Sequence, residues 1–251
     1  MAPDASLNAE VRRVDEDRWL ASRFAWAGVR ARLIALYALN HEIARTADVV
    51  REPAIGDIRL QWLRDALKDV FAGGTPRGHP VLAAFAAAHA ETPFDQMLFV
   101  GLIEARGRDL DSAPFENWAA LERYVDATAG IVLRLALVAC GETAAHDEVA
   151  TAAGRAWGYC TLMRPAPRLA ARGRAVLPAD NPDPHAMLAR AQAAHADVRR
   201  LSRTLPSALF PAIGYLALVP SYLRALEHGR TDTNLLTRQF TLVLASATGR
   251  L

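Results

Sequence analysis

Apolar side chains recur three or four positions apart along almost the whole of this 251-residue chain. Two such series are Leu33, Leu36, Tyr37 and Leu39, and Trp62, Leu63, Ala66, Leu67 and Val70. This period is that of the α-helix, and no alternating run of β-branched residues competes with it. Breaks rich in proline and glycine divide the chain into about ten helical segments. We therefore expect an all-α fold, a bundle in which outer helices surround central ones.

The length and composition favour one domain over residues 1–251. The chain is 52% hydrophobic, which is ample for a buried core. We treat residues 1–20 as an N-terminal extension and expect part of it to form an ordered helix.

The charge balance excludes one class of partner. Lysine and arginine number 29 and aspartate and glutamate 27, so the formal net charge is only +2. We therefore expect no nucleic-acid partner.

The two cysteines and the N-terminus bear on localisation. Cys140 and Cys160 lie within apolar helical patterns, where a reduced thiol is the commonest state, although a disulfide between them stays an alternative. The first twenty residues contain acids where a signal peptide is apolar. The apolar runs 131–140 and 208–219 are shorter than the roughly 18 residues of a spanning helix. These features predict a cytoplasmic protein without a signal peptide or transmembrane helix.

Three common catalytic patterns are missing from the sequence. The glycine-rich stretch 72–80 lacks the Gly-Lys-Ser/Thr ending of a phosphate-binding loop. The seven histidines form no pair at four-residue spacing, and the cysteines do not flank them as zinc ligands would. No Gly-x-Ser-x-Gly signature indicates a nucleophilic serine.

Five stretches in order resemble the squalene/phytoene synthase family, with a likeness from about Ser22 to near His228. They are "RARLIALYALNHEIARTAD" (30–48), "HPVLAAF" (79–85), "LIEARGRDLD" (102–111), "LERYVDATAGIVLRLALVACG" (121–141) and "AGRAWGYCTLMRPAPRLAARGRAVLP" (153–178). The resemblance implies the isoprenoid-synthase-type helical bundle with a central cavity. Active members join two prenyl diphosphates, held through Mg²⁺ by two aspartate-rich motifs on facing helices. Carboxylates four residues apart on a helix share one face, and Mg²⁺ bridges such oxygens to phosphate.

The first motif is degenerate in this chain. Its final aspartate falls on Asp48, but its partner falls on Ala44 and the adjacent acid on Arg45. Glu42 cannot replace the missing acid, because six residues at about 100° each place it well around a helix from Asp48. We expect Asp48 to pair with Arg45 instead.

The second motif is degenerate as well. It should begin directly after Arg164, but its first aspartate falls on Pro165 and its last on Leu169, with Arg168 beside it. Pro165 and Pro167 disfavour a helix, so we expect this helix to end early. The family features that flank the motif are retained as Gly173, Leu177 and Pro178.

The side chains near the two motifs have a functional and a structural interpretation. Candidate cavity or anion contacts are Tyr37, His41, Arg45, Asp48, Arg164 and Arg168. The structural interpretation makes the tyrosine and histidine core residues, the aspartate half of an ion pair, and the arginines a solvated basic turn. Trp157 is a candidate for core packing in the same way.

The resemblance implies a function in which these losses make sense. One branch of the family also lacks these acids, the branch that resembles the mitochondrial complex I assembly factor with a squalene/phytoene synthase-like domain. We therefore expect a non-catalytic binding or assembly protein with no catalytic residue, metal or cofactor. Its expected partners are respiratory complex I subunits or assembly intermediates, with peripheral contact at the inner membrane.

Two alternatives stay open. The first is a prenyltransferase that condenses two prenyl diphosphates at an altered Mg²⁺ site using Asp48 and Asp109. The second is a protein that keeps the cavity to bind an isoprenoid or lipid. The C-terminal stretches 205–229 and 234–251 are strongly apolar. They are either buried in the bundle or exposed toward a membrane or a partner.

Overall fold

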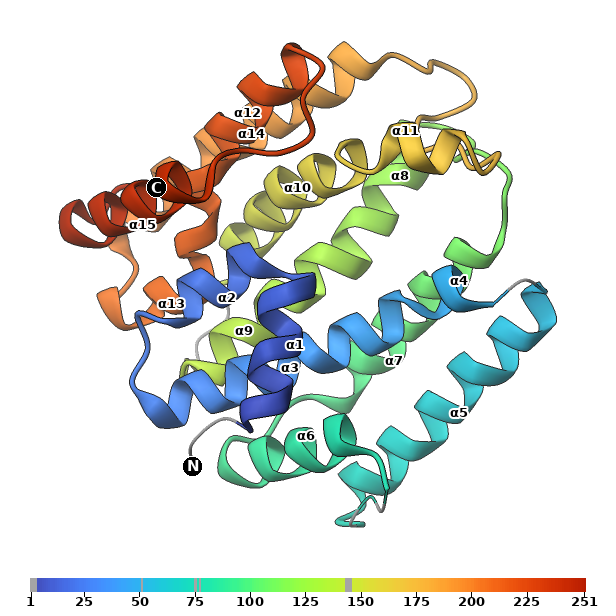
Figure 1. Ribbon diagram of the computed structural model, residues 1–251, viewed down its shortest axis with the longest axis vertical. Coiled ribbons are helices and arrows are strands. Elements are labelled where there is room, and N and C mark those ends of the chain that lie inside the picture. The colour runs from blue at the N-terminus through green and yellow to red at the C-terminus, as the bar shows by residue number, and fades with distance from the viewer. Residues whose placement is uncertain (1–3, 51, 75, 77, 143–145) are drawn as a thin grey trace. The chain divides into compact units, whose positions relative to one another are not determined.

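The structure is a computed structural model that describes residues 4–50, 52–74, 76, 78–142 and 146–251. Within these residues the regular secondary structure is helical throughout and contains no strand, which confirms the all-α fold (Figure 1). The described residues fall into two compact units.

The first unit comprises Met1–Asp111, Leu135–Ala144 and Ala208–Ala212. Its elements are α1 (Ala5–Val14), α2 (Glu16–Ser22), α3 (Ala27–Ala44), α4 (Thr46–Val49), α5 (Pro53–Phe71), α6 (Pro80–Glu91), α7 (Gln96–Gly107) and the 3₁₀ turn η1 (Arg108–Leu110). Helix α3 is buried along nearly its whole length, and α1, α6 and α7 pack against it. The N-terminal segment belongs to this core, because Leu7 and Val11 of α1 are buried.

The second unit comprises Ser112–Arg134, Ala145–Ser207 and Ile213–Leu251. Its elements are α8 (Trp118–Val125), the π-helical turn η2 (Asp126–Gly130), α10 (Asp147–Met163), α11 (Ala166–Ala170), α12 (Pro184–Leu201), the 3₁₀ turns η3 (Ser202–Thr204) and η5 (Gly214–Leu218), α14 (Val219–Glu227) and α15 (Leu235–Thr248). The divisions between the units include points within α9 (Ile131–Ala139), η4 (Ser207–Leu209) and α13 (Phe210–Ile213).

Helix α10 is the central element of the second unit. It packs against α12, α14 and the π-helical turn η2. The approach to η2 is so close that a Cβ atom added at Gly154 would lie 2.4 Å from Cα of Gly130. A glycine at this position lets the two backbones touch.

Short polar side chains and prolines begin the helices. Asp4, Asp95 and Asn117 accept hydrogen bonds from the first free N–H groups of α1, α7 and α8. Pro53 and Pro80 occupy the first turns of α5 and α6, where a missing N–H costs nothing.

One segment is longer and more apolar than we expected. Ser207–Glu227 has 21 residues and a mean hydropathy of 1.4, which suffices by length and composition to cross a membrane. The prediction that no apolar segment reaches this length is wrong, because the helical run continues past Val219 through Tyr222 and Leu223. However, 72% of the apolar window is buried in the structure, and core helices of water-soluble proteins pass the same test.

Both cysteines are free thiols, as the sequence favoured. Burial raises the pKa of each to about 12. Neither is therefore a thiolate at neutral pH. Cys160 is a buried core residue, and Cys140 is half-buried.

Candidate functional site

The first degenerate motif lies where α3 ends. Ala44 is the last residue of α3, Arg45 forms the turn, and Asp48 is exposed on the short helix α4. This turn interrupts the helix between the two positions that hold the motif's acids in the family.

Glu42 is the acid that the first unit buries at this place. Its carboxylate accepts a hydrogen bond from Arg59 of α5, and Nε of Arg45 lies 3.4 Å from its Oε2. Nε2 of His79 lies 3.9 Å from Oε1. A buried carboxylate needs such partners to remain charged. Glu42 is therefore already neutralised by protein cations.

The predicted pair between Asp48 and Arg45 stays a prediction. Arg45 does pair with Glu42, three residues earlier on α3. Asp48 itself lies past the turn at Arg45, on the short helix α4.

Tyr37 and His41 lie on α3 before the motif. Tyr37 is fully buried, with the Arg18 guanidinium 5.6 Å from its ring centroid. Burial lowers the pKa of His41, and although the Glu10 carboxylate raises it, Arg45 lowers it further. His41 is therefore held toward its neutral form. Both positions are typical of packed residues.

The second degenerate motif begins where α10 ends. The helix stops at Met163, as the prolines predict, and Pro165 precedes the five-residue helix α11. Pro167 occupies the first turn of α11. The motif positions are thus split between a turn and a new short helix.

Arg164 connects this turn to the segment that follows α14. Its Nε donates to the carbonyl of Thr231 (3.1 Å), and its Nη2 lies 3.6 Å from Oδ1 of Asp232. Its guanidinium also lies over the ring of Tyr222, 4.2 Å from the centroid. The side chain is therefore engaged within the second unit.

Three other residues singled out in the sequence have structural neighbours. Trp157 is buried against the edges of Tyr215 and Tyr222. Oδ2 of Asp109 lies 3.1 Å from Nη1 of Arg106. Gly173 has φ +73° after α11, where Arg174 N–H donates to the Leu169 carbonyl and closes the helix end.

The residues at the motif positions do not fit a magnesium site. Ala44, Pro165 and Leu169 have no side-chain oxygen to offer, and Arg45 and Arg168 are cationic. Among the described residues, no group of three or more His, Cys, Asp or Glu side chains is placed to hold a metal ion.

A pocket of about 630 Å³ is lined in part by α11, and we call it the α11 pocket. It is lined by Pro114, Met163, Ala166, Pro167, Ala170, Arg174, Ala175, Val176, Leu177, Pro178, Ala179, Pro182, Leu226, Gly229, Arg230 and Thr231. The motif positions Pro165, Arg168 and Leu169 do not line it, whereas Ala166 and Pro167 of the same segment do.

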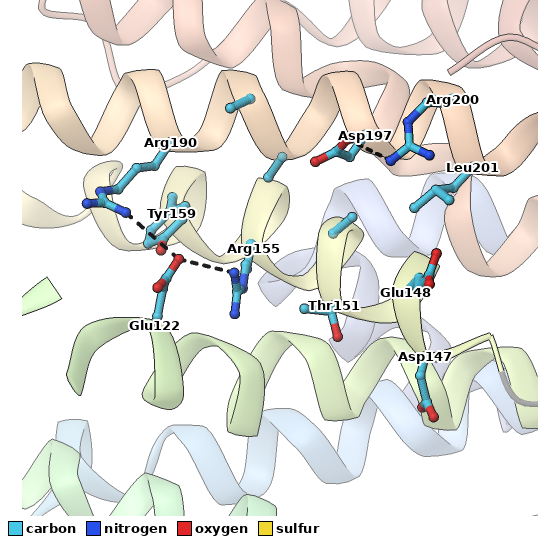
Figure 2. Close-up of a pocket in the computed structure, with 13 residues that line it drawn as sticks. Glu122, Asp147, Glu148, Thr151, Arg155, Tyr159, Arg190, Asp197, Arg200 and Leu201 are labelled. Atoms are coloured by element: carbon cyan, nitrogen blue, oxygen red, sulfur yellow. Dashed lines mark hydrogen bonds and ion pairs between the residues drawn. The ribbon is translucent and has the colours of Figure 1, made fainter. Parts of the chain in front are cut away.

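A second hollow of about 570 Å³ lies between α8, α10 and α12, which we call the α10–α12 groove (Figure 2). Arg155 forms two hydrogen bonds to Asp126 (2.9 and 2.8 Å) and lies 3.2 Å from Glu122. The hydrogen bond to Asp126 raises the pKa of Arg155. Burial raises the pKa of Tyr159, whose hydroxyl has no hydrogen-bond partner among the described residues.

Two solved structures share this fold. Squalene synthase HpnC from Alicyclobacillus acidocaldarius aligns with a TM-score of 0.77 at 22% identity over 89% of this chain and 92% of that one. A dehydrosqualene synthase in complex with ligand aligns with a TM-score of 0.77 at 16% identity over 98% and 95%. The architecture is therefore the isoprenoid-synthase-type helical fold, as the sequence resemblance implied. The central cavity stays a prediction.

The family is also established by sequence. Residues 11–183 match the family described as squalene/phytoene synthase. This chain belongs to the squalene/phytoene synthase family. It is also similar to "NADH dehydrogenase (ubiquinone) complex I, assembly factor 6" of Mus musculus (29% identity) and Bos taurus (30%), each over 171 residues. That match covers 68% of this chain and 51% of the relatives, so the chain spans about half of their length.

Sequence reasoning missed the partners rather than the motifs. Arg59 was not a candidate, although it binds Glu42 across 17 positions. The only sequence signal for this role was that Arg59 is a charged residue within the apolar pattern of residues 53–71. No sequence signal indicated the α11 pocket, because the residues that line it are spread along the chain from Pro114 to Thr231.

Proposed function

We propose that this chain is a non-catalytic member of the squalene/phytoene synthase family that acts as a binding or assembly protein for respiratory complex I. The observation that carries the proposal is the loss of oxygen ligands at three motif positions, Ala44, Pro165 and Leu169. Allylic ionisation needs a metal to stabilise the departing diphosphate, and this chain offers arginines beside those positions instead.

The environment of the first motif supports the same proposal. The buried acid nearest to it, Glu42, is compensated by Arg59 and Arg45. A carboxylate that already has two guanidinium partners would have to give them up to bind Mg²⁺. The similar mammalian proteins are named as assembly factors of complex I. The proposal extends this role and this partner to the present chain. It includes a cytoplasmic location with peripheral contact at the membrane, and no cofactor.

Calorimetric titration with a farnesyl diphosphate analogue tests the catalytic half of the proposal. The full chain is titrated with farnesyl thiodiphosphate, with and without Mg²⁺. We expect no increase in affinity when Mg²⁺ is added. Magnesium-dependent binding would overturn the proposal in favour of a prenyltransferase with an altered metal site.

Complementation tests the assembly half. A strain that lacks this gene should show reduced assembled complex I on native gels, and the wild-type chain should restore it. Asp48→Ala should restore it equally well, because the side chain is exposed and has no metal to hold. Unchanged complex I in the deletion strain would contradict the assembly role, and failure of Asp48→Ala alone would indicate residual metal chemistry.

A further inference from the structure

The α11 pocket has the size and lining of a small-molecule site. Its volume of about 630 Å³ lies within the roughly 300–1,000 Å³ typical of ligand pockets. Most of its lining is proline, alanine, valine, leucine and methionine side chains. Such a surface accepts a hydrocarbon chain.

The charged residues of the lining are of one sign. Arg174 and Arg230 line the pocket, and no acid does. A guanidinium binds carboxylate and phosphate oxygens through paired N–H groups.

We propose that the α11 pocket binds a single-chain amphiphile with an anionic head, its hydrocarbon chain against the apolar lining and its head at Arg230. Fatty acids and prenyl phosphates share this chemistry. The proposal does not depend on the proposed function, because Pro165, Arg168 and Leu169 do not line the pocket and no metal takes part in the binding.

Calorimetry with soluble probes tests this proposal on the full chain. Dodecanoate and dodecyl phosphate should both bind, and dodecanol, which has no charge, should bind roughly tenfold more weakly. Octanoate should bind at least about tenfold more weakly than dodecanoate, because four methylene groups leave the lining. A preference for dodecyl phosphate would point to prenyl phosphates, and a preference for dodecanoate to fatty acids. Absent binding, or equal binding of dodecanoate and dodecanol, would overturn the proposal.

Two pairs of variants assign the binding to this pocket. Arg230→Gln should weaken both anionic probes roughly tenfold, and Arg224→Gln should not, because Arg224 is exposed but does not line the pocket. Ala170→Trp should abolish binding by filling the pocket, whereas Ala171→Trp at the neighbouring exposed position should leave it unchanged. All four positions are exposed, so these variants should fold. Equal effects within each pair would place the ligand elsewhere and overturn the assignment.

Discussion

The α11 pocket and the α10–α12 groove are similar in volume, about 630 and 570 Å³, but differ in how their charges are arranged. In the groove, acids and arginines alternate and satisfy each other, as Figure 2 shows for Glu122 between Arg155 and Arg190. In the pocket, the charged side chains are two arginines within an apolar lining. The two hollows therefore differ in the sign of their lining charges rather than in volume, and only the pocket presents a single sign to a ligand.

This comparison explains why the groove does not carry the ligand proposal. An ion pair that is already formed must be broken before either member can bind a ligand charge. Arg155 would give up contacts with both Asp126 and Glu122. The groove is therefore best described as the contact that positions α8, α10 and α12, and the predictions that follow test the packing of α10 and α12.

The largest effect is expected at Gly154, which sets the position of the helix that both hollows share. In Gly154→Ala, the new Cβ would lie 2.4 Å from Cα and 2.6 Å from N of Gly130. Backbone atoms cannot rotate away, so α10 must shift, at a cost of about 3 kcal/mol or more in the free energy of unfolding. Urea denaturation followed by circular dichroism measures this loss.

A glycine without such a contact is the control. A Cβ added at Gly107 on α7 would lie 4.0 Å from Leu60. Gly107→Ala should therefore leave stability unchanged or raise it by up to about 1 kcal/mol. If Gly154→Ala lowered the free energy of unfolding no more than Gly107→Ala does, the contact between α10 and η2 would be looser than described.

Arg155→Gln should have the next largest effect, because it removes two charged hydrogen bonds to Asp126 and the contact with Glu122. The side chains are about a third exposed, so solvent screens part of the interaction, and we expect a loss of about 1.5 kcal/mol. The loss should shrink at high salt. Arg190→Gln, whose charge lies 3.9 Å from Glu122, should lose less. The reverse order would contradict Arg155 as the residue that holds the groove.

A smaller effect, dependent on pH, is expected from His195 on α12. Burial lowers its pKa and Arg199 lowers it further, although a hydrogen bond involving the Leu216 backbone raises it. The unfolded chain then takes up a proton first, so stability is full above the ordinary pKa of about 6.5 and falls as pH falls through and below it. Denaturation between pH 5 and 7.5 should show this slope, and His195→Gln should flatten it.

The exposed His185 on the same helix is the control. His185→Gln should keep the slope of the wild-type protein. A slope that survives in His195→Gln would mean that another group causes it.

These two hollows also show what the sequence could and could not predict. The helical period predicted the fold, and Pro165 and Pro167 predicted the end of α10 at Met163, because both are properties of neighbouring residues. The motif positions followed from the family's spacing.

Contacts between distant segments could not be predicted in this way. The link between Arg59 and Glu42 joins two helices, and the α11 pocket is closed by residues as far apart as Pro114 and Arg230. The helical period fixes which face a residue occupies, and it does not say which helix that face meets.

The smallest effect is expected at the rim of the groove, where Arg200 lies 2.9 Å from Asp197 one turn earlier on α12. Both side chains are more than half exposed, 66% and 55%, so water competes for each charge, and the ordering of two long side chains offsets the attraction. Arg200→Gln should change the free energy of unfolding by less than about 0.5 kcal/mol. This pair has the same short separation as the bond from Arg155 to Asp126, yet it joins residues of one helix instead of two. A loss at Arg200 as large as that at Arg155 would mean that distance alone sets the strength of these pairs, and the distinction between the groove's interior and its rim would fail.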